Sequence, residues 1–136
     1  MATPNLWGEL PSIDDIRAPI TVLKEQAAQL QIMTRGVLRA RVMNKQEGGW
    51  FTLELRIVAP AIENYEFTVL ETRHSIGGYP LEVTPSWRRG RSDSTIECAD
   101  EGEFVKALGD ILASDRVRQV IRSLLAQSKA LGKSAK

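Results

Sequence analysis

The stretch WFTLELRIVAPAIENYEFTVL, residues 50–70, decides the fold of this 136-residue chain. Apolar and polar side chains alternate through its first half, and the apolar members are Phe51, Leu53, Leu55 and Ile57. Because successive side chains of a strand point to opposite faces, this alternation predicts a strand with one apolar face. Pro60 stops that strand, residues 63–64 predict a turn, and the alternation returns over residues 65–69, although Leu70 breaks it. So short a connection requires the two strands to pair antiparallel.

The flanking sequence continues this pattern on both sides. Residues 38–42 alternate in the same way, and Gly48-Gly49 predicts the turn that leads into the strand at residue 50. Gly77-Gly78 predicts a further turn, residues 81–84 a fourth strand and residues 95–98 a short fifth strand. The middle of the chain is therefore expected to form an antiparallel meander.

Helical periodicity occurs before and after the strands. Pro19 suits the first residue of a helix because it lacks an amide donor, and Gly36 suits its C-cap. Ser12 is expected to cap a short turn before that helix, and Ser114-Asp115 to divide two C-terminal helices. The apolar positions of the three helices are Ile20, Leu23, Ala27 and Leu30; Phe104, Val105, Leu108, Ile111 and Leu112; and Val117, Val120, Ile121, Leu124 and Leu125.

These elements predict an α+β fold: a four- to five-stranded antiparallel meander with an N-terminal helix and two C-terminal helices packed on one face. Residues 1–12 are expected to form an irregular arm, which Leu6 and Trp7 are candidates to hold against the domain. Residues 13–131 form the single domain and residues 132–136 a frayed tail. The wet face of the sheet is expected to carry Arg39, Arg41, Glu54, Arg56, Glu66, Thr68, Thr72 and His74.

Composition excludes several classes of protein. The chain has eighteen Lys and Arg and seventeen Asp and Glu, and its net charge of +1 is not that of a polycation that binds nucleic acid through overall charge. The longest apolar run covers residues 57–62, whereas a bilayer span needs about 20 residues, so no integral membrane segment is expected. A single cysteine and the lack of a secretory signal favour a cytoplasmic protein.

The sequence offers little for catalysis or metal binding. His74 is the only histidine and Cys98 the only cysteine, which is too few for a structural zinc site. No nucleophile elbow, Walker loop or dinucleotide fingerprint occurs. We therefore predict no catalytic residue, no metal and no cofactor, with His74 at the surface and Cys98 as a buried small hydrophobe. Glu54 and Glu66 are expected to pair with the arginines of the wet face.

Two basic segments are candidates for binding. The loop at residues 87–91 carries Trp87, Arg88, Arg89 and Arg91, which suggest phosphate contacts with a stacked base. The last helix has no acid after Asp115 and gathers Arg118 and Arg122 beside its apolar stripe. Nucleic-acid or polyanion binding is therefore one hypothesis. Alternatively, these cations serve solubility, or balance the acidic helix before them within one chain or between two.

Our leading hypothesis is a small non-enzymatic protein-interaction module that self-associates, as a homodimer. A meander leaves two sheet edges, and a partner strand can use one that is not protected. A further alternative is a small-ligand cavity between sheet and helices. The aromatic residues considered for its lining are Trp50, Phe51, Tyr65, Phe67 and Tyr79.

Overall fold

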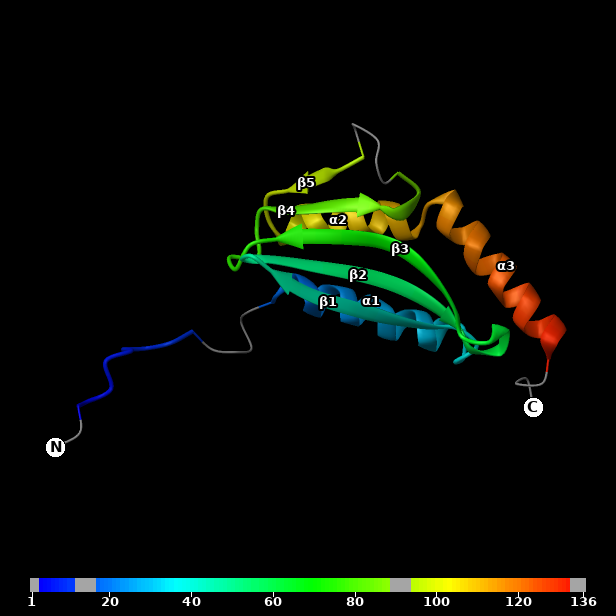
Figure 1. Cartoon of the computed structure of the whole chain (residues 1–136), viewed down its shortest axis with the longest axis horizontal. Helices are drawn as coiled ribbons and strands as arrows, with labels where there is room; N and C mark the ends of the chain where they lie inside the picture. Colours follow the sequence, from blue (N-terminus) through cyan, green and yellow to red (C-terminus); the bar gives the residue numbers. More distant parts are fainter. Residues whose placement is uncertain (1–2, 12–16, 89–93, 133–136) are drawn as a thin grey trace.

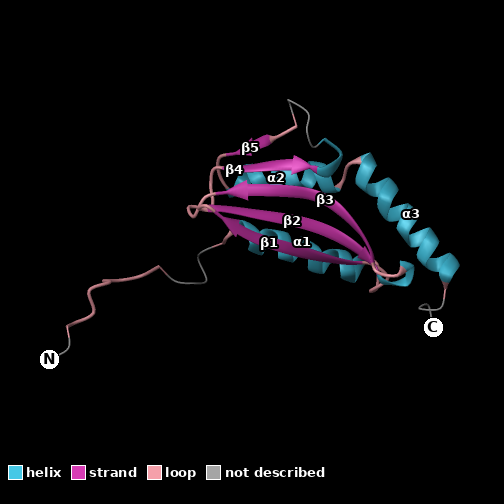
Figure 2. Cartoon of the chain, in the orientation of Figure 1, coloured by secondary structure: helices cyan, strands magenta, loops and turns pink. Residues whose placement is uncertain are grey.

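The computed structural model describes residues 3–11, 17–88 and 94–132 as one sheet with three helices. The helices are α1 (Pro19–Met33), α2 (Glu101–Leu112) and α3 (Asp115–Leu131). The strands are β1 (Arg39–Glu47), β2 (Trp50–Ala59), β3 (Tyr65–His74), β4 (Leu81–Pro85) and β5 (Ile96–Cys98), with 3-10 turns η2 (Pro60–Ile62) and η3 (Ser86–Arg88). The strands pair in chain order and each is antiparallel to the next, which confirms the predicted α+β meander (Figures 1 and 2).

Local sequence explains where the elements start and stop. Gly48 and Gly49 both have positive φ and form the two-residue β1–β2 turn, a conformation that favours glycine. Helix α1 begins at Pro19 as predicted, but it ends at Met33 rather than running to a C-cap at Gly36. The amide of Gly36 still closes the helix end, because it donates to the carbonyl of Gln31 at 2.8 Å. The predicted turn capped by Ser12 lies outside the described residues.

The two C-terminal helices are capped by side chains. Asp100 accepts a hydrogen bond from the amide of Glu103 at 2.9 Å, and the Glu103 carboxylate accepts one from the amide of Ala99 at 2.7 Å. Ser114 accepts from the amide of Val117 at 3.3 Å at the start of α3. The bonds to Asp100 and Ser114 satisfy first-turn amides that a helix leaves without partners, and the Ser114 cap lies at the predicted break between α2 and α3.

The core lies on one face of the sheet. Helix α1 packs against β1 and β2, while α2 packs against β4 and β5. Figure 1 shows both helices behind the sheet, with α3 running out past the end of the strands. The fully buried side chains at this face include Leu23, Leu38, Leu53, Val69, Leu70, Leu81, Val83 and Phe104. No helix in the described ranges is both long and apolar enough to cross a bilayer.

A β-bulge in β3 changes which side chains face the core. Leu55 pairs with Leu70 but Arg56 pairs with Thr68, so one extra residue, Val69, is inserted on β3. The side chains beyond this point swap faces. Thr72 is therefore 0% exposed and His74 only 8% exposed. The prediction that both lie on the wet face is wrong, because it carried the alternation unchanged through the break at Leu70.

Candidate functional site

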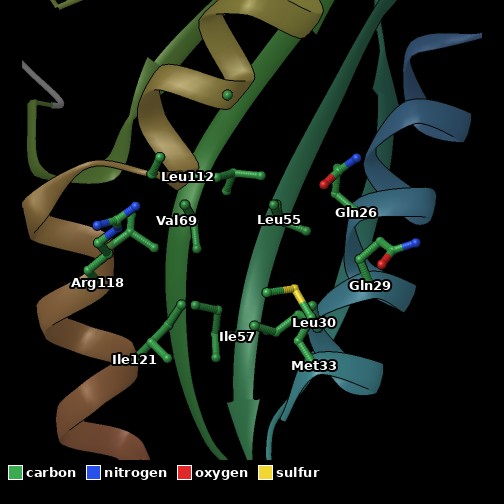
Figure 3. A pocket seen from close by; sticks show the side chains of 14 residues that line it. Gln26, Gln29, Leu30, Met33, Leu55, Ile57, Val69, Leu112, Arg118 and Ile121 are labelled. Carbon is green, nitrogen blue, oxygen red and sulfur yellow. The ribbon is translucent and has the colours of Figure 1, made fainter.

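An apolar groove opens between the helices on the inner face of the sheet. Its floor consists of Leu55 and Ile57 from β2 and Val69 from β3, and Figure 3 shows α1 along one side with α2 and α3 along the other. Leu30 and Met33 line it from α1, and Ala40, Gly109, Leu112, Ala113, Val117 and Ile121 add further apolar surface. The groove has a volume of about 380 Å³. This volume and lining fall within the range of ligand-binding clefts.

The groove is open because α3 leaves the sheet. Helix α2 ends at Leu112, and α3 then contacts η2 rather than continuing along the strands towards α1. The α1 side is left with apolar side chains in solvent, of which Met33 is 77% exposed. Because the groove combines an apolar lining with an exposed side chain on α1, it is the leading candidate for a binding site.

Polar groups line the rim of the groove. Gln26 and Gln29 stand on α1, and Arg118 stands opposite them on α3 (Figure 3). The exposed cations Arg122 and Lys129 lie on the same side of α3 as Arg118, while Asp115 is the only acid of this helix. The α3 rim is therefore electropositive and favours a ligand that carries negative charge beside its apolar part.

At the other end of the inner face, the closed end, a side-chain bridge joins the flanking helices, beside a cavity of about 320 Å³. Arg17 bridges the two flanking helices, at 2.9 Å from Glu25 of α1 and 3.0 Å from Glu101 of α2. These contacts raise the pKa of Arg17, chiefly through the hydrogen bond to Glu25. Behind this bridge Tyr79 packs against Phe104, with ring centroids 6.4 Å apart. Burial raises the pKa of Tyr79 to about 12.

His74 is held inside this closed end. Its ring stacks on Phe51 with centroids 5.3 Å apart, and its Nδ1 donates to the carbonyl of Ser75 at 2.7 Å. Both residues line a cavity of about 320 Å³, together with Asn44 and Tyr79. The prediction of a surface histidine is therefore wrong.

The residues weighed for catalysis are not brought together. His74 pairs with Leu81 across β3–β4, and Leu81 pairs with Cys98 across β4–β5, so two strand spacings, roughly 10 Å, separate the histidine from the thiol. Cys98 is buried as predicted, and burial raises the pKa of its thiol. Within the described ranges no three His, Cys, Asp or Glu side chains lie where they can share a metal ion.

The predicted basic sites lie in two places. Trp87 is half-buried in η3 and packs against the core. Arg88 follows it in η3, whereas Arg89 and Arg91 lie outside the described residues. Arg118 and Arg122 are exposed on α3, and Arg118 alone of this set lines the groove.

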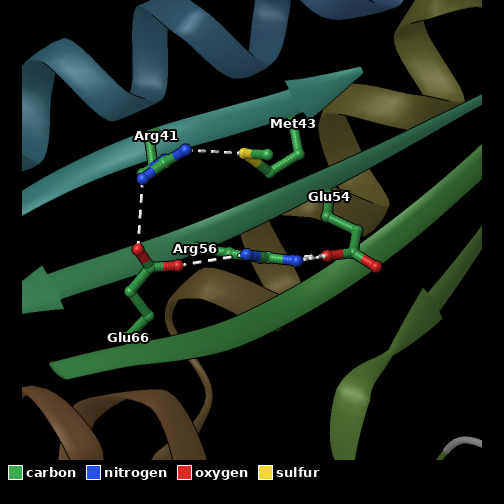
Figure 4. A network of polar contacts seen from close by, with 5 residues as sticks. All are labelled: Arg41, Met43, Glu54, Arg56 and Glu66. Atoms are coloured by element: carbon green, nitrogen blue, oxygen red, sulfur yellow. Dashed lines mark hydrogen bonds and ion pairs between the residues drawn. The ribbon is translucent and has the colours of Figure 1, made fainter. Parts of the chain in front are cut away.

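The outer face of the sheet carries the expected ion pairs. Glu66 accepts from Arg41 and from Arg56, each at 3.1 Å, and Arg56 also reaches Glu54 at 2.6 Å (Figure 4). Hydrogen bonds to Glu54 and Glu66 raise the pKa of Arg56. The carboxylates are thus occupied by arginines, as predicted, and form a crosslink over β1, β2 and β3.

Sequence reasoning missed the groove itself. Leu30 and Ile121 were assigned to helix faces that cover the sheet, and none of the five aromatic residues considered for a cavity lines this groove. Phe51 and Tyr79 line the cavity at the closed end, and Tyr65 and Phe67 border a hollow on the other side of α3. The guanidinium carbon of Arg73 lies 4.2 Å from the centroid of the Trp50 ring. One signal was available: residues 32–33, Ile-Met, extend the apolar surface of α1 beyond the stripe that the sheet buries.

The N-terminal arm carries a second set of exposed apolar side chains. Leu6, Trp7 and Leu10 are 79%, 81% and 69% exposed, and residues 3–11 form no helix or strand. Leu6 and Trp7 therefore do not hold the arm against the domain in this structure.

No family model matches the sequence, and no curated protein or solved structure matches it significantly. The functional argument therefore depends on the groove and on the chain's own chemistry.

Proposed function

We propose that this chain is a non-enzymatic protein-interaction module whose groove binds a peptide segment with large apolar side chains and acidic residues. The observation that carries the proposal is the apolar groove between α1 and α2–α3, floored by Leu55, Ile57 and Val69. Helical walls over an apolar floor suit an amphipathic segment that inserts two or three anchoring side chains. Arg118 on the rim supplies the cation for an acidic residue of that segment.

The lining of the groove favours a peptide over nucleic acid or a small apolar ligand. The groove itself offers nucleic acid one cation, Arg118, and no aromatic side chain on which a base stacks. A small apolar ligand would use the apolar lining but not the cation at the rim, Arg118. A segment of polypeptide uses both.

Selection from a displayed library of short random peptides tests this function. The bait is the full-length protein with Leu6→Ala, Trp7→Ala and Leu10→Ala, which removes exposed apolar side chains outside the groove that could bind peptides nonspecifically. We expect the enriched peptides to combine Trp, Leu or Phe with Asp or Glu, and to lose binding to Met33→Glu. Ile32→Glu is the matched control, since Ile32 is exposed on the same helix but does not line the groove. Peptides that bind equally to both variants would contradict the proposed site.

A further inference from the structure

The cavity at the closed end is separate from the groove. It lies between the inner face of β1–β3, the first turn of α1 and the loop that joins β3 to β4, and no residue lines both this cavity and the groove. Its volume of about 320 Å³ lies within the range of pockets that hold small molecules. The protein therefore has room for a second ligand that is independent of the first.

Most of the cavity wall is apolar. The apolar side chains come from three elements and one loop, and they are Pro19, Ile20, Phe51, Leu53 and Ile76. Ile76 is 85% exposed although it lines the cavity, so this wall still has apolar surface in water. Such a wall favours a ligand with an apolar body, because contact between the two removes apolar surface from water.

His74 supplies a hydrogen-bond acceptor in this apolar wall. The residue is only 8% exposed, and its ring is held in place by the stack on Phe51 and by the bond from Nδ1 to the carbonyl of Ser75. A carbonyl only accepts, so Nδ1 carries the proton and Nε2 of the neutral ring is an acceptor. Within the described part of the chain Nε2 has no partner, yet it is not sealed from solvent as the Oγ1 of Thr72 is. A buried side chain thus holds a fixed acceptor that lacks a donor.

Asn44 supplies a second polar group. It follows Ala40 and Val42 on the inner face of β1, where alternation places apolar side chains, and its side-chain amide makes no hydrogen bond in the described ranges. Asn44 on β1 and His74 on β3 lie on either side of β2, so their backbones are two strand spacings, about 10 Å, apart. A molecule with one ring and a short chain spans the space between these two side chains.

The charges at the cavity favour an uncharged ligand. Arg17 is the only charged residue of the lining, and all three of its guanidinium nitrogens already contact carboxylates. Two of these nitrogens donate to Glu25 and the third lies 3.0 Å from Glu101. Two acids thus face one cation, which leaves no positive charge for an anionic ligand.

We infer that this cavity binds a small uncharged molecule with an apolar body and a hydroxyl group, such as a phenol. The ring packs against Phe51 and Leu53, and the hydroxyl donates a hydrogen bond to Nε2 of His74. Asn44 offers a polar contact at the other side of the ligand. This site goes beyond the proposed function and does not depend on it.

Calorimetric titration of the full-length protein with matched probes at neutral pH tests the inference. The probes are para-propylphenol, its methyl ether para-propylanisole, and para-propylbenzoate. The phenol should bind at least about tenfold more tightly than the ether, because the ether has no proton to donate and leaves Nε2 unpaired. The negatively charged benzoate should bind more weakly than the phenol. Equal binding of phenol and ether, tighter binding of the benzoate, or no saturable binding of the phenol overturns the inference.

A variant of His74 tests the hydrogen bond itself. His74→Phe keeps an aromatic ring to stack on Phe51 but removes Nε2, so phenol and ether should bind it alike. The two ligands are compared on one variant, so a change in its stability cancels. Thr72→Val is the matched control, since Thr72 is buried on the same strand but does not line this cavity. Preference for the phenol that persists in His74→Phe, or that disappears in Thr72→Val, contradicts the assigned acceptor.

The location of the probe distinguishes this cavity from the groove. Nuclear Overhauser contacts from the ring protons of the phenol should reach His74 and Phe51. Met33→Glu, which alters the groove, should leave the affinity for the phenol unchanged. Loss of phenol binding in Met33→Glu would place the probe in the groove and overturn the inference. Failure of the peptide selection would leave this inference intact, because the two sites share no residue.

Discussion

The two ends of the inner face differ in whether side chains bridge the gap between the flanking helices. At the closed end, Arg17 joins α1 to the start of α2, and Tyr79 packs against Phe104 behind it. At the open end, α3 turns away after Leu112 and leaves Leu30 and Ile121 around an apolar groove. The same sheet and the same two helices are thus joined by a side-chain bridge beside a cavity of about 320 Å³ at one end, and left unjoined over an apolar groove of about 380 Å³ at the other. This difference is the reason for which we propose the open end, and not the bridged one, as the peptide-binding site.

The comparison predicts that a leucine-to-alanine substitution lowers the free energy of unfolding by different amounts at two positions of α1. Leu23→Ala should lower the free energy of unfolding by about 2–5 kcal/mol, because Leu23 is fully buried and its removal leaves a cavity. Leu30→Ala should cost only about 1 kcal/mol, because Leu30 is half-buried and the groove already admits solvent. Urea denaturation of both variants measures the difference. Equal losses would mean that the groove is part of the packed core.

Leucine and alanine have similar helix propensities, so the two variants differ in tertiary packing alone and serve as controls for each other. Peptide binding should respond in the opposite order. Leu30→Ala should weaken it through the lost groove contact, whereas Leu23→Ala should spare it wherever the protein remains folded.

The pH dependence of stability sharpens the description of the closed end. Burial raises the pKa of Tyr79 to about 12 from its ordinary value of 10. The unfolded chain therefore releases this proton before the folded chain does, so the stabilisation is complete below pH 10 and is lost as the pH rises towards 12. Tyr79→Phe should remove this part of the alkaline loss. Denaturant midpoints of both proteins at pH 8 and at pH 11 measure it, and parallel declines would place the phenol in water.

Much of this architecture follows from sequence because it depends on local rules. Alternation, the Gly48-Gly49 turn and Pro19 define the strands and the start of α1 from chemistry within a few residues. The bulge at Val69 was signalled by two adjacent apolar residues, but a single sequence gives no register by which to recognise an inserted residue. Its consequence, the burial of His74, was missed for the same reason.

The groove was beyond prediction because it depends on a helix direction. The capping residue Ser114 shows where α3 begins but not the angle at which it leaves α2. Amphipathic patterning indicates that α3 buries one face, and Val117 and Leu124 are indeed buried. It does not show that α3 packs on η2 rather than across the sheet towards Leu30. A site that forms between separate elements can be recognised only once their relative positions are known, whereas a site built from one sequence motif can be predicted from the sequence.

A buried hydroxyl at the closed end gives a smaller effect of opposite sign. The Oγ1 of Thr72 has no hydrogen-bond partner in the described part of the chain, and the residue is 0% exposed between Leu53 and Val83. Thr72→Val keeps the shape and the β-branch, so it should stabilise the protein by about 1 kcal/mol. Thermal unfolding by calorimetry should show a higher midpoint than wild type. A lower midpoint would show that the Thr72 hydroxyl makes a hydrogen bond in the folded protein.

The smallest effect is expected for the ion pairs that close the end of the sheet. Arg17, Glu25 and Glu101 all keep 40–50% of their side-chain surface in water, so solvent screens their attraction. Arg17→Ala should lower the denaturation midpoint only slightly at low ionic strength. The difference should vanish near about 1 M salt, where exposed charges are screened within a few ångströms. Leu23→Ala, whose cost is apolar, should keep its full deficit under the same conditions. A large decrease in the denaturation midpoint of Arg17→Ala that does not depend on salt would show instead that Arg17 acts through packing of its aliphatic stem. The contrast between the two ends would then depend on apolar contacts alone.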